Sequence, residues 1–163
     1  MLADTNSLLW FLPFTVPIAI WVAWSDMKFM KIPNKAVLAL LAVYVIMGLF
    51  VFPLKLWAWG LALGAIVLLI GFGATAARLM GAGDAKFGAA MAPFFVTADI
   101  RTVLFLFAAC LFAALTSHRI AKHSSIIRDR VPDWLSWTHK GFPMGYPLAG
   151  LLIFYPLLVV WLG

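Results

Sequence analysis

The hexapeptide Gly81-Ala82-Gly83-Asp84-Ala85-Lys86 lies between two long apolar segments of the chain. Glycine has no Cβ, so Gly81 and Gly83 permit unusual backbone dihedral angles and the close approach of a neighbouring helix. Asp84 follows them directly, and an ionisable residue at the edge of a membrane helix is energetically costly. The hexapeptide therefore predicts both a boundary between two helices and a candidate functional position.

The composition around this hexapeptide is that of an integral membrane protein. Hydrophobic residues make up 65% of the 163 residues, charged residues only 11%, and the mean hydropathy is +1.04. A soluble domain carries about 25% charged residues. We predict one all-α domain, a polytopic bundle of about six transmembrane helices. The predicted spans cover residues 7–24, 36–51, 56–77, 85–98, 101–117 and 144–162.

The basic residues distinguish the two faces of this bundle. Of the 12 Lys and Arg residues, Lys55 and Arg101 fall on one predicted face, which leaves ten on the other. Cytoplasmic loops are enriched in Lys and Arg, so we predict that the second face is cytoplasmic and that both termini point outward. The polar stretch 118–141 is then a cytoplasmic loop. Its basic residues are expected to contact anionic lipid rather than nucleic acid.

A second acid, Asp26, follows the first predicted helix. The chain crosses the membrane twice between Asp26 and Asp84, and an even number of crossings returns it to the same face. The fourth predicted helix is short, because Asp84 to Ala98 reaches about 22 Å at about 1.5 Å per residue, against a hydrocarbon core of about 30 Å. Asp84 is therefore expected to lie below the membrane surface. Ordinary structural roles also fit, with Asp84 as a helix N-cap and Asp26 balanced by Lys28.

Two nearby carboxyl groups outside bulk water share a proton, because both cannot easily ionise. One can act as a base on water while the protonated one hydrogen-bonds a substrate carbonyl, and this chemistry needs no metal or other cofactor. Cys110 is the only cysteine, which excludes a disulfide within the chain and a zinc site of the CxxC type. The helix dipoles favour the shared proton on Asp26 and, together with Lys86, the negative charge on Asp84.

Two signatures of the chain resemble those of the type IV prepilin peptidases, which are polytopic aspartic proteases of the GxGD type. The first is Asp26 with the downstream Lys31-Ile32-Pro33-Asn34, and the second is Gly81-x-Gly83-Asp84-x-Lys86. A third element, Pro143-Met144-Gly145-Tyr146-Pro147-Leu148-Ala149, is similar to the Pro-x-Gly-x-x-x-Ala element before the last helix of that family. The resemblance extends from residue 26 to residue 149.

This resemblance implies an aspartic endopeptidase of the prokaryotic inner membrane that removes the leader of prepilins or pseudopilins. Cleavage at the cytoplasmic face, between a short basic leader and the hydrophobic helix of the substrate, is implied as well. The first inner loop is short and has no cysteine, unlike that of the bifunctional members, which also N-methylate their product. The chain is most similar to the short members that serve tight-adherence (Flp-type) pili, so methyltransferase activity is not expected.

The resemblance also implies roles for individual residues. Asp26 and Asp84 are implied as the catalytic acids, and the residues that shape their surroundings are Gly81, Gly83 and Lys86. Lys28 and Lys31 are candidates for contact with the substrate, although topology and lipid contact explain them more simply.

Two other functions remain open from the sequence. One is a different GxGD protease that cuts ordinary transmembrane peptides, but those relatives usually have Tyr before the first Asp, and here Ser25 precedes Asp26. The other is a small transporter or assembly subunit whose acids relay protons. The predicted helices supply no further buried acid for such a relay, which argues against it.

Overall fold

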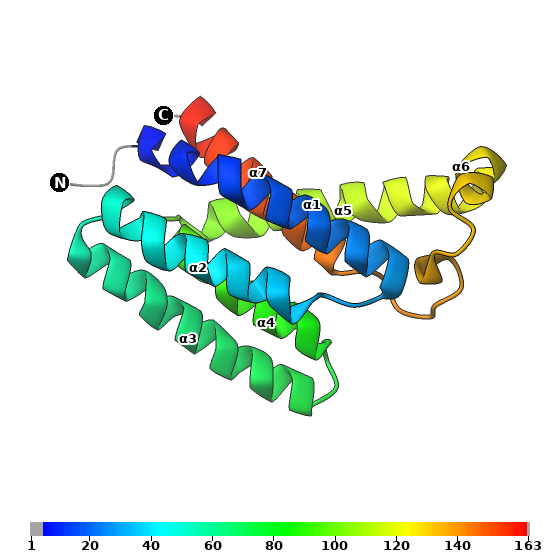
Figure 1. Cartoon of the computed structure of the whole chain (residues 1–163), viewed down its shortest axis with the longest axis horizontal. Helices are drawn as coiled ribbons and strands as arrows, with labels where there is room; N and C mark the ends of the chain where they lie inside the picture. The colour runs from blue at the N-terminus through cyan, green and yellow to red at the C-terminus, as the bar shows by residue number, and fades with distance from the viewer. Residues whose placement is uncertain (1–4, 163) are drawn as a thin grey trace.

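The computed structural model describes residues 5–162, which form helices and their connections (Figure 1). Three short 3₁₀ helices are η1 (Thr5–Phe11), η2 (Ala92–Phe95) and η3 (Leu135–Trp137). The α-helices are α1 (Leu12–Phe29), α2 (Asn34–Val51), α3 (Leu54–Ala76), α4 (Ala82–Met91), α5 (Ile100–His123), α6 (Ser125–Arg130) and α7 (Gly145–Leu162). The predicted all-α fold is confirmed.

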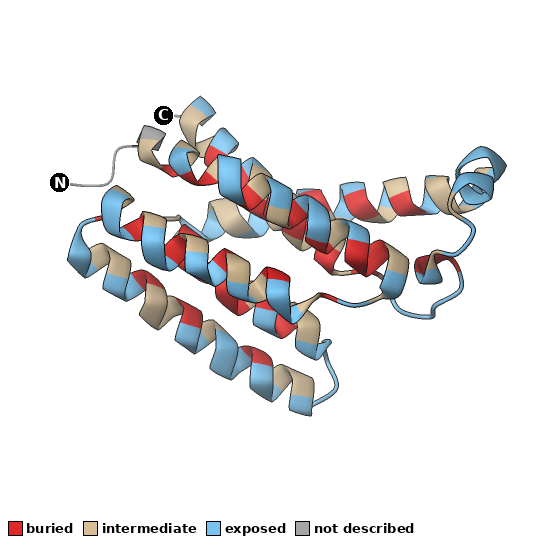
Figure 2. Cartoon of the chain, in the orientation of Figure 1, coloured by how far each residue is buried: buried red, intermediate tan, exposed pale blue. Residues whose placement is uncertain are grey.

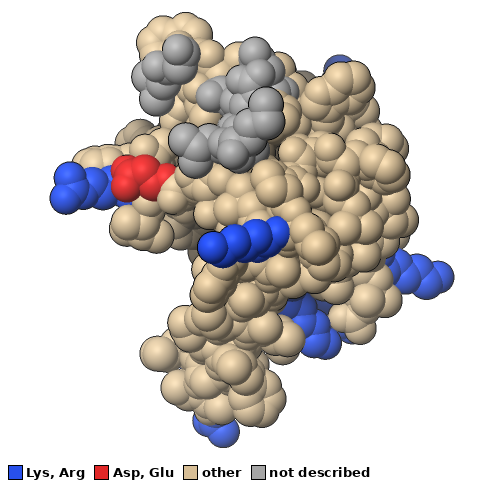
Figure 3. Space-filling model, turned by 90° about the vertical axis from the view of Figure 1, so that its left-hand side faces the viewer, with Lys and Arg blue, Asp and Glu red and all other residues tan. Residues whose placement is uncertain are grey.

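The chain runs back and forth, so its connections alternate between two ends of the bundle (Figure 1). The α1–α2, α3–α4 and α5–α7 connections lie at the end that holds α6, here called the α6 end. The α2–α3 and η2–α5 connections lie at the opposite end, here called the η1 end. Figure 3 shows this η1 end, whose surface is mostly uncharged.

Within residues 5–162, four helices are long and apolar enough to cross a membrane: Ser7–Phe29, Asn34–Val51, Leu54–Ala76 and Ile100–His123. The apolar stretch of the last helix, Gly145–Trp161 in α7, is just below the length of these four, and α4 with η2 is shorter still. Several boundaries differ from the predicted spans, and at two of them a helix continues well beyond its most apolar part. Helix α1 reaches Phe29, so Asp26 lies in its last turn, and α5 reaches His123, beyond the start of the predicted loop.

Buried residues lie on the inward-facing sides of the helices (Figure 2). Many large apolar residues are exposed on the outside of the bundle. The core contains an aromatic cluster in which the ring centres of Phe11 and Phe94 are 5.0 Å apart and those of Tyr44 and Phe94 are 5.2 Å apart. The Tyr44 hydroxyl donates a hydrogen bond to the Trp57 carbonyl at 3.2 Å. Outward-facing residues such as Phe72 and Phe105 are more than 70% exposed, as a surface in contact with lipid requires.

Helices α3 and α4 pack closely because the buried residues of α3 are all glycines: Gly60, Gly64 and Gly71. A Cβ at Gly71 would lie 2.8 Å from the Cβ of Ala85, closer than two carbon atoms can approach. Ala85 is the neighbour of Asp84, so this contact fixes the depth at which α4 begins. The glycines on this face of α3 let α4 approach closely, and the position of Asp84 in the bundle follows from this contact.

We expect Gly71→Val to destabilise the protein by about 1–3 kcal/mol, because the new side chain overpacks the α3–α4 contact. Gly73→Val is a matched control, since Gly73 lies in the same helix and a Cβ there meets no atom within 4 Å. The comparison is made from the midpoints of thermal unfolding of the two variants in detergent. Equal midpoints would show that α3 and α4 do not depend on this contact.

Candidate active site

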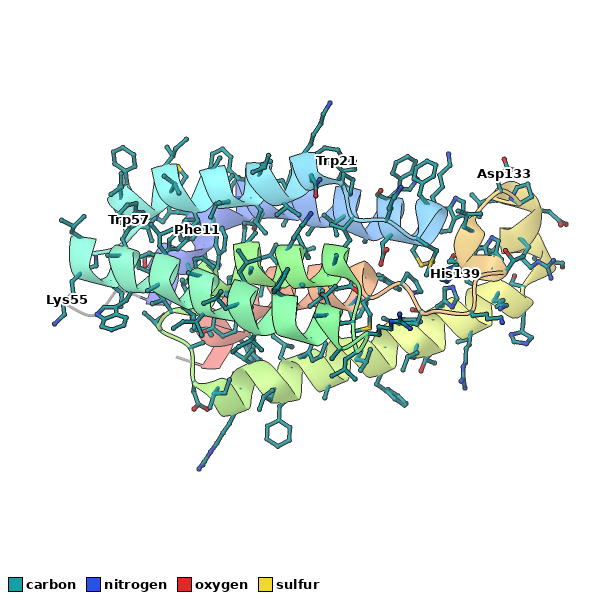
Figure 4. All side chains as sticks on the ribbon, turned by 90° about the horizontal axis from the view of Figure 1, so that it is seen from below. Phe11, Trp21, Lys55, Trp57, Asp133 and His139 are labelled. Atoms are coloured by element: carbon teal, nitrogen blue, oxygen red, sulfur yellow. The ribbon has the colours of Figure 1, made fainter. Side chains whose placement is uncertain are left out.

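Asp26 and Asp84 both line one open pocket of about 560 Å³ at the α6 end of the bundle. Its walls are the end of α1, the α1–α2 connection, the start of α4 and the segment before α7. His139, from that last segment, marks this end in Figure 4, opposite Lys55 and Trp57. The prediction that topology returns both acids to the same face of the bundle therefore agrees with their positions, although they belong to different helices.

The carboxyl group of Asp26 is buried, with 5% of the residue exposed, and is held by the backbone. Its Oδ2 accepts a hydrogen bond from the Gly145 N–H at 2.6 Å. A Cβ at Gly145 would lie 2.9 Å from the same oxygen, so only glycine leaves room for the carboxyl group here. The C-cap residue after α1 is Met30, which has a left-handed backbone (φ 52°) and donates its N–H to the Asp26 carbonyl.

Asp84 lies in the first turn of α4, and the N-cap of that helix is Gly81 rather than Asp84. The Asp84 carboxyl group accepts a hydrogen bond from the Gly81 N–H, which is a helix-capping contact. Gly81 has φ −72° and ψ 144°, which any residue adopts, so the conformational freedom that glycine permits is not used here. Its importance is steric, because a Cβ at Gly81 would lie 2.9 Å from the Asp84 Oδ2.

Gly83 and Lys86 also lie at the pocket, in different relations to Asp84. A Cβ at Gly83 would lie 3.4 Å from the Cβ of Ile32, an ordinary packing distance, so α4 lies against the α1–α2 connection here. The Lys86 Nζ is 3.4 Å from the Oδ1 of Asn34, to which it donates a hydrogen bond. Lys86 thus links the start of α4 to the start of α2.

Burial has the largest effect on the pKa of Asp84 and raises it, while the hydrogen bond from the Gly81 N–H lowers it. The prediction that the helix terminus and Lys86 favour the anion of Asp84 therefore leaves out the dominant influence. A carboxyl group with a raised pKa remains protonated to higher pH, which suits it to sharing a proton with a neighbour.

The raised pKa of Asp84 predicts how the stability of the protein changes with pH. A carboxyl group whose folded-state pKa is raised contributes stability that is fully present below its unfolded-state pKa and is lost as the pH rises through the folded-state pKa. We therefore expect Asp84→Asn, which cannot ionise, to raise the midpoint of thermal unfolding relative to wild type at about pH 8 more than at about pH 4. Tryptophan fluorescence in detergent measures the midpoints, and a larger gain at the lower pH would contradict the assignment.

The two lysines proposed as substrate contacts have different positions. Lys31 lines the pocket. Lys28 instead places its Nζ 5.1 Å from the ring centres of both Trp24 and Phe29. The interpretation of Lys28 as a residue for lipid contact and topology therefore suits its position better than contact with substrate.

Several residues at the pocket were not predicted from the sequence as functional: Asn34, His139, Phe142, Met144 and Gly145. The sequence signal for Gly145 was its place in the Pro-x-Gly-x-x-x-Ala element. Nothing in the sequence singles out His139, whose Nδ1 accepts a hydrogen bond from the Gly141 N–H at 2.9 Å.

Two carboxyl groups that face one pocket can divide the work of hydrolysis, one as a base and the other as an acid. Among the residues that the structure describes, no three His, Cys, Asp or Glu side chains are grouped so as to hold a metal ion. The fold and the pocket together define a multi-pass membrane protein with a candidate two-carboxylate site at one end of an apolar bundle.

Comparison with known proteins gives the family. The sequence matches the family described as the type IV leader peptidase family over residues 14–117, about two thirds of the chain, so the protein belongs to this family and is a peptidase-family member. The matched residues include Asp26 and Asp84, whereas Gly145 lies beyond them. No curated protein and no solved structure matched the chain.

Proposed function

We propose that this protein is an aspartic endopeptidase that removes the leader peptide of prepilins or pseudopilins at the cytoplasmic face of the inner membrane. The observation that carries the proposal is the placement of Asp26 and Asp84, from helices far apart in the sequence, in the lining of one pocket. Membership of the type IV leader peptidase family supports the reaction class. The proposal includes no methyl transfer.

In this reaction, one carboxylate of the pair takes a proton from a water molecule as the water attacks the scissile carbonyl. The other carboxyl group is protonated and donates a hydrogen bond to the carbonyl oxygen, which gains negative charge. The tetrahedral intermediate then breaks down as the leaving amine receives a proton. Asp26 and Asp84 take these roles as a pair, since the proton that they share belongs to neither residue alone.

The proposed orientation rests on charge. Lys31, Lys86 and His139 line the pocket, and the basic residues of α6 lie at the same end of the bundle. The opposite end is poor in charge (Figure 3). On the basis of the positive-inside rule, the proposal has the pocket at the cytoplasmic face and both termini on the outer face. A short basic leader would approach the pocket from the cytoplasm.

Coexpression with a prepilin tests the proposal, with loss of the leader measured by mass spectrometry. We expect wild-type protein to process the prepilin, and Asp26→Asn and Asp84→Asn to leave it unprocessed. Asp133→Asn, an exposed acid at the same end of the molecule (Figure 4), is the control and is expected to process normally.

Other outcomes would reject the proposal. Processing by either Asn variant of the pair would show that these two acids do not form the catalytic site. If wild type leaves prepilins intact but cuts unrelated transmembrane peptides, the protein is a different intramembrane protease. If it cuts neither substrate, the non-enzymatic alternative of a transporter or assembly subunit is favoured.

A further inference from the structure

A second hollow of the molecule is an apolar groove of about 460 Å³ between α3, α4 with η2, α5 and α7. Its lining includes Leu63, Gly88, Ala92, Leu104 and Leu148. A Cβ at Gly88 would meet no atom within 4 Å, so this part of α4 faces open space. Leu104, on the α5 side, is 59% exposed.

The groove lies between α3 and α5, which pack mainly against other elements rather than against each other. Helix α3 packs against α4 and η2, and α5 packs against α7. Both α3 and α5 are long enough to cross a membrane, whereas α4 has only 10 residues before η2 begins (Figure 1). The two long helices thus form walls above a recessed floor.

Helices α4 and α7 extend from the pocket that holds the two acids to the groove. Asp84 lines that pocket, and Gly88, one turn further along the same face of α4, lines the groove. The same relation holds on α7, where Gly145 binds the Asp26 carboxyl group and Leu148, three residues later, lines the groove. Two helices therefore lead directly from the carboxyl groups into the groove.

We propose that this groove holds the apolar helix of the substrate, immediately beyond the bond that is cut, an inference that rests on the proposed peptidase function. A peptide bound at the carboxyl groups that continues into the bundle enters an apolar region. There it must be helical, because every backbone N–H and C=O needs a partner within its own segment. The missing side chain of Gly88 lets a helix backbone approach α4 closely.

The first test uses a prepilin that wild-type protein cleaves and a truncated peptide with the same leader and cleavage site but no apolar helix. Gly88→Phe, which fills the groove, is expected to raise KM for the full-length prepilin about tenfold, as expected for the lost burial of an apolar side chain. The same variant is expected to cleave the truncated peptide as wild type does. Gly73→Phe, at the other glycine with open space, is expected to change neither reaction.

A wild-type KM for the full-length prepilin in Gly88→Phe would overturn the proposal. An equal loss with both substrates would do the same, since the substitution would then act on Asp84 rather than on the groove. If wild type cleaves neither substrate, the proposed function fails first, which is a separate and recognisable result.

Photocrosslinking provides a second test, which does not depend on a substitution that fills the groove. Benzoylphenylalanine at Leu104 is expected to crosslink to the apolar helix of the full-length prepilin. The same group at Phe50, which is 82% exposed on α2 and does not line the groove, is expected not to do so. Crosslinks from Leu104 only to lipid, or only to a second copy of this chain, would overturn the proposal.

Discussion

Asp26→Asn and Asp84→Asn are each expected to lower kcat for leader cleavage by about 10³-fold or more, the contribution typical of a positioned acid or base. An amide in place of either carboxyl group can neither accept a proton from water nor donate one to the leaving amine. KM is expected to change little, because neither group supplies much of the binding surface. Initial rates with purified protein in detergent and a synthetic prepilin measure both constants.

The double variant distinguishes a catalytic pair from two independent acids. Residues that act as one unit have strongly non-additive effects, so the double variant is expected to be no slower than the slower single variant. Circular dichroism controls for the fold and should give the same helicity in all three proteins. A double variant in which the two losses multiply would contradict a shared role.

Gly145→Ala is expected to lower kcat about 100-fold, the cost of moving a catalytic group by about 1 Å. The new Cβ would lie 2.9 Å from the Asp26 Oδ2 and 3.2 Å from its Cγ, so the carboxyl group must move. The variant retains the N–H that donates to Asp26, and the effect is therefore steric rather than the loss of a donor.

Gly150→Ala in the same helix is the control for this variant, because its nearest contact would be the Sγ of Cys110 at 3.4 Å. We expect this control to retain most of the wild-type kcat. The comparison uses the same cleavage assay, with the thermal midpoint of each variant as a check on folding. A Gly145→Ala protein with wild-type kcat would show that the Asp26 carboxyl group does not need its observed position.

The apolar segments were enough to predict the fold class. The even number of membrane crossings between the two acids was enough to predict that they lie at the same end of the bundle. Alternating apolar segments predict the helices, and two crossings between Asp26 and Asp84 bring the chain back to the same face. The contact between Asp26 and Gly145 is different, because it joins residues 119 apart in the sequence. No local pattern encodes which backbone N–H will face a given carboxyl group.

Some predictions differed from the structure for identifiable physical reasons. Gly81 was expected to permit both unusual dihedral angles and close packing, and of these only its small size matters, because its dihedral angles are ordinary. Lys28 was a candidate for contact with the substrate, although topology and lipid contact were the simpler interpretation, and its position suits the simpler one. One further turn of α1 directs Lys28 to the aromatic rings of Trp24 and Phe29. Such helix ends depend on neighbouring elements that are distant in the sequence.

The hydrogen bond between Asp26 and Gly145 also has a consequence for the order in which the molecule is made. Ribosomes deliver the first helix long before the last, so Asp26 enters the membrane without the N–H that positions it in the finished protein. The site is therefore completed only when α7 inserts beside α1. We expect a nascent chain that stops before Gly145 to contain both acids and yet to be inactive, which delays proteolysis until synthesis of the bundle is complete.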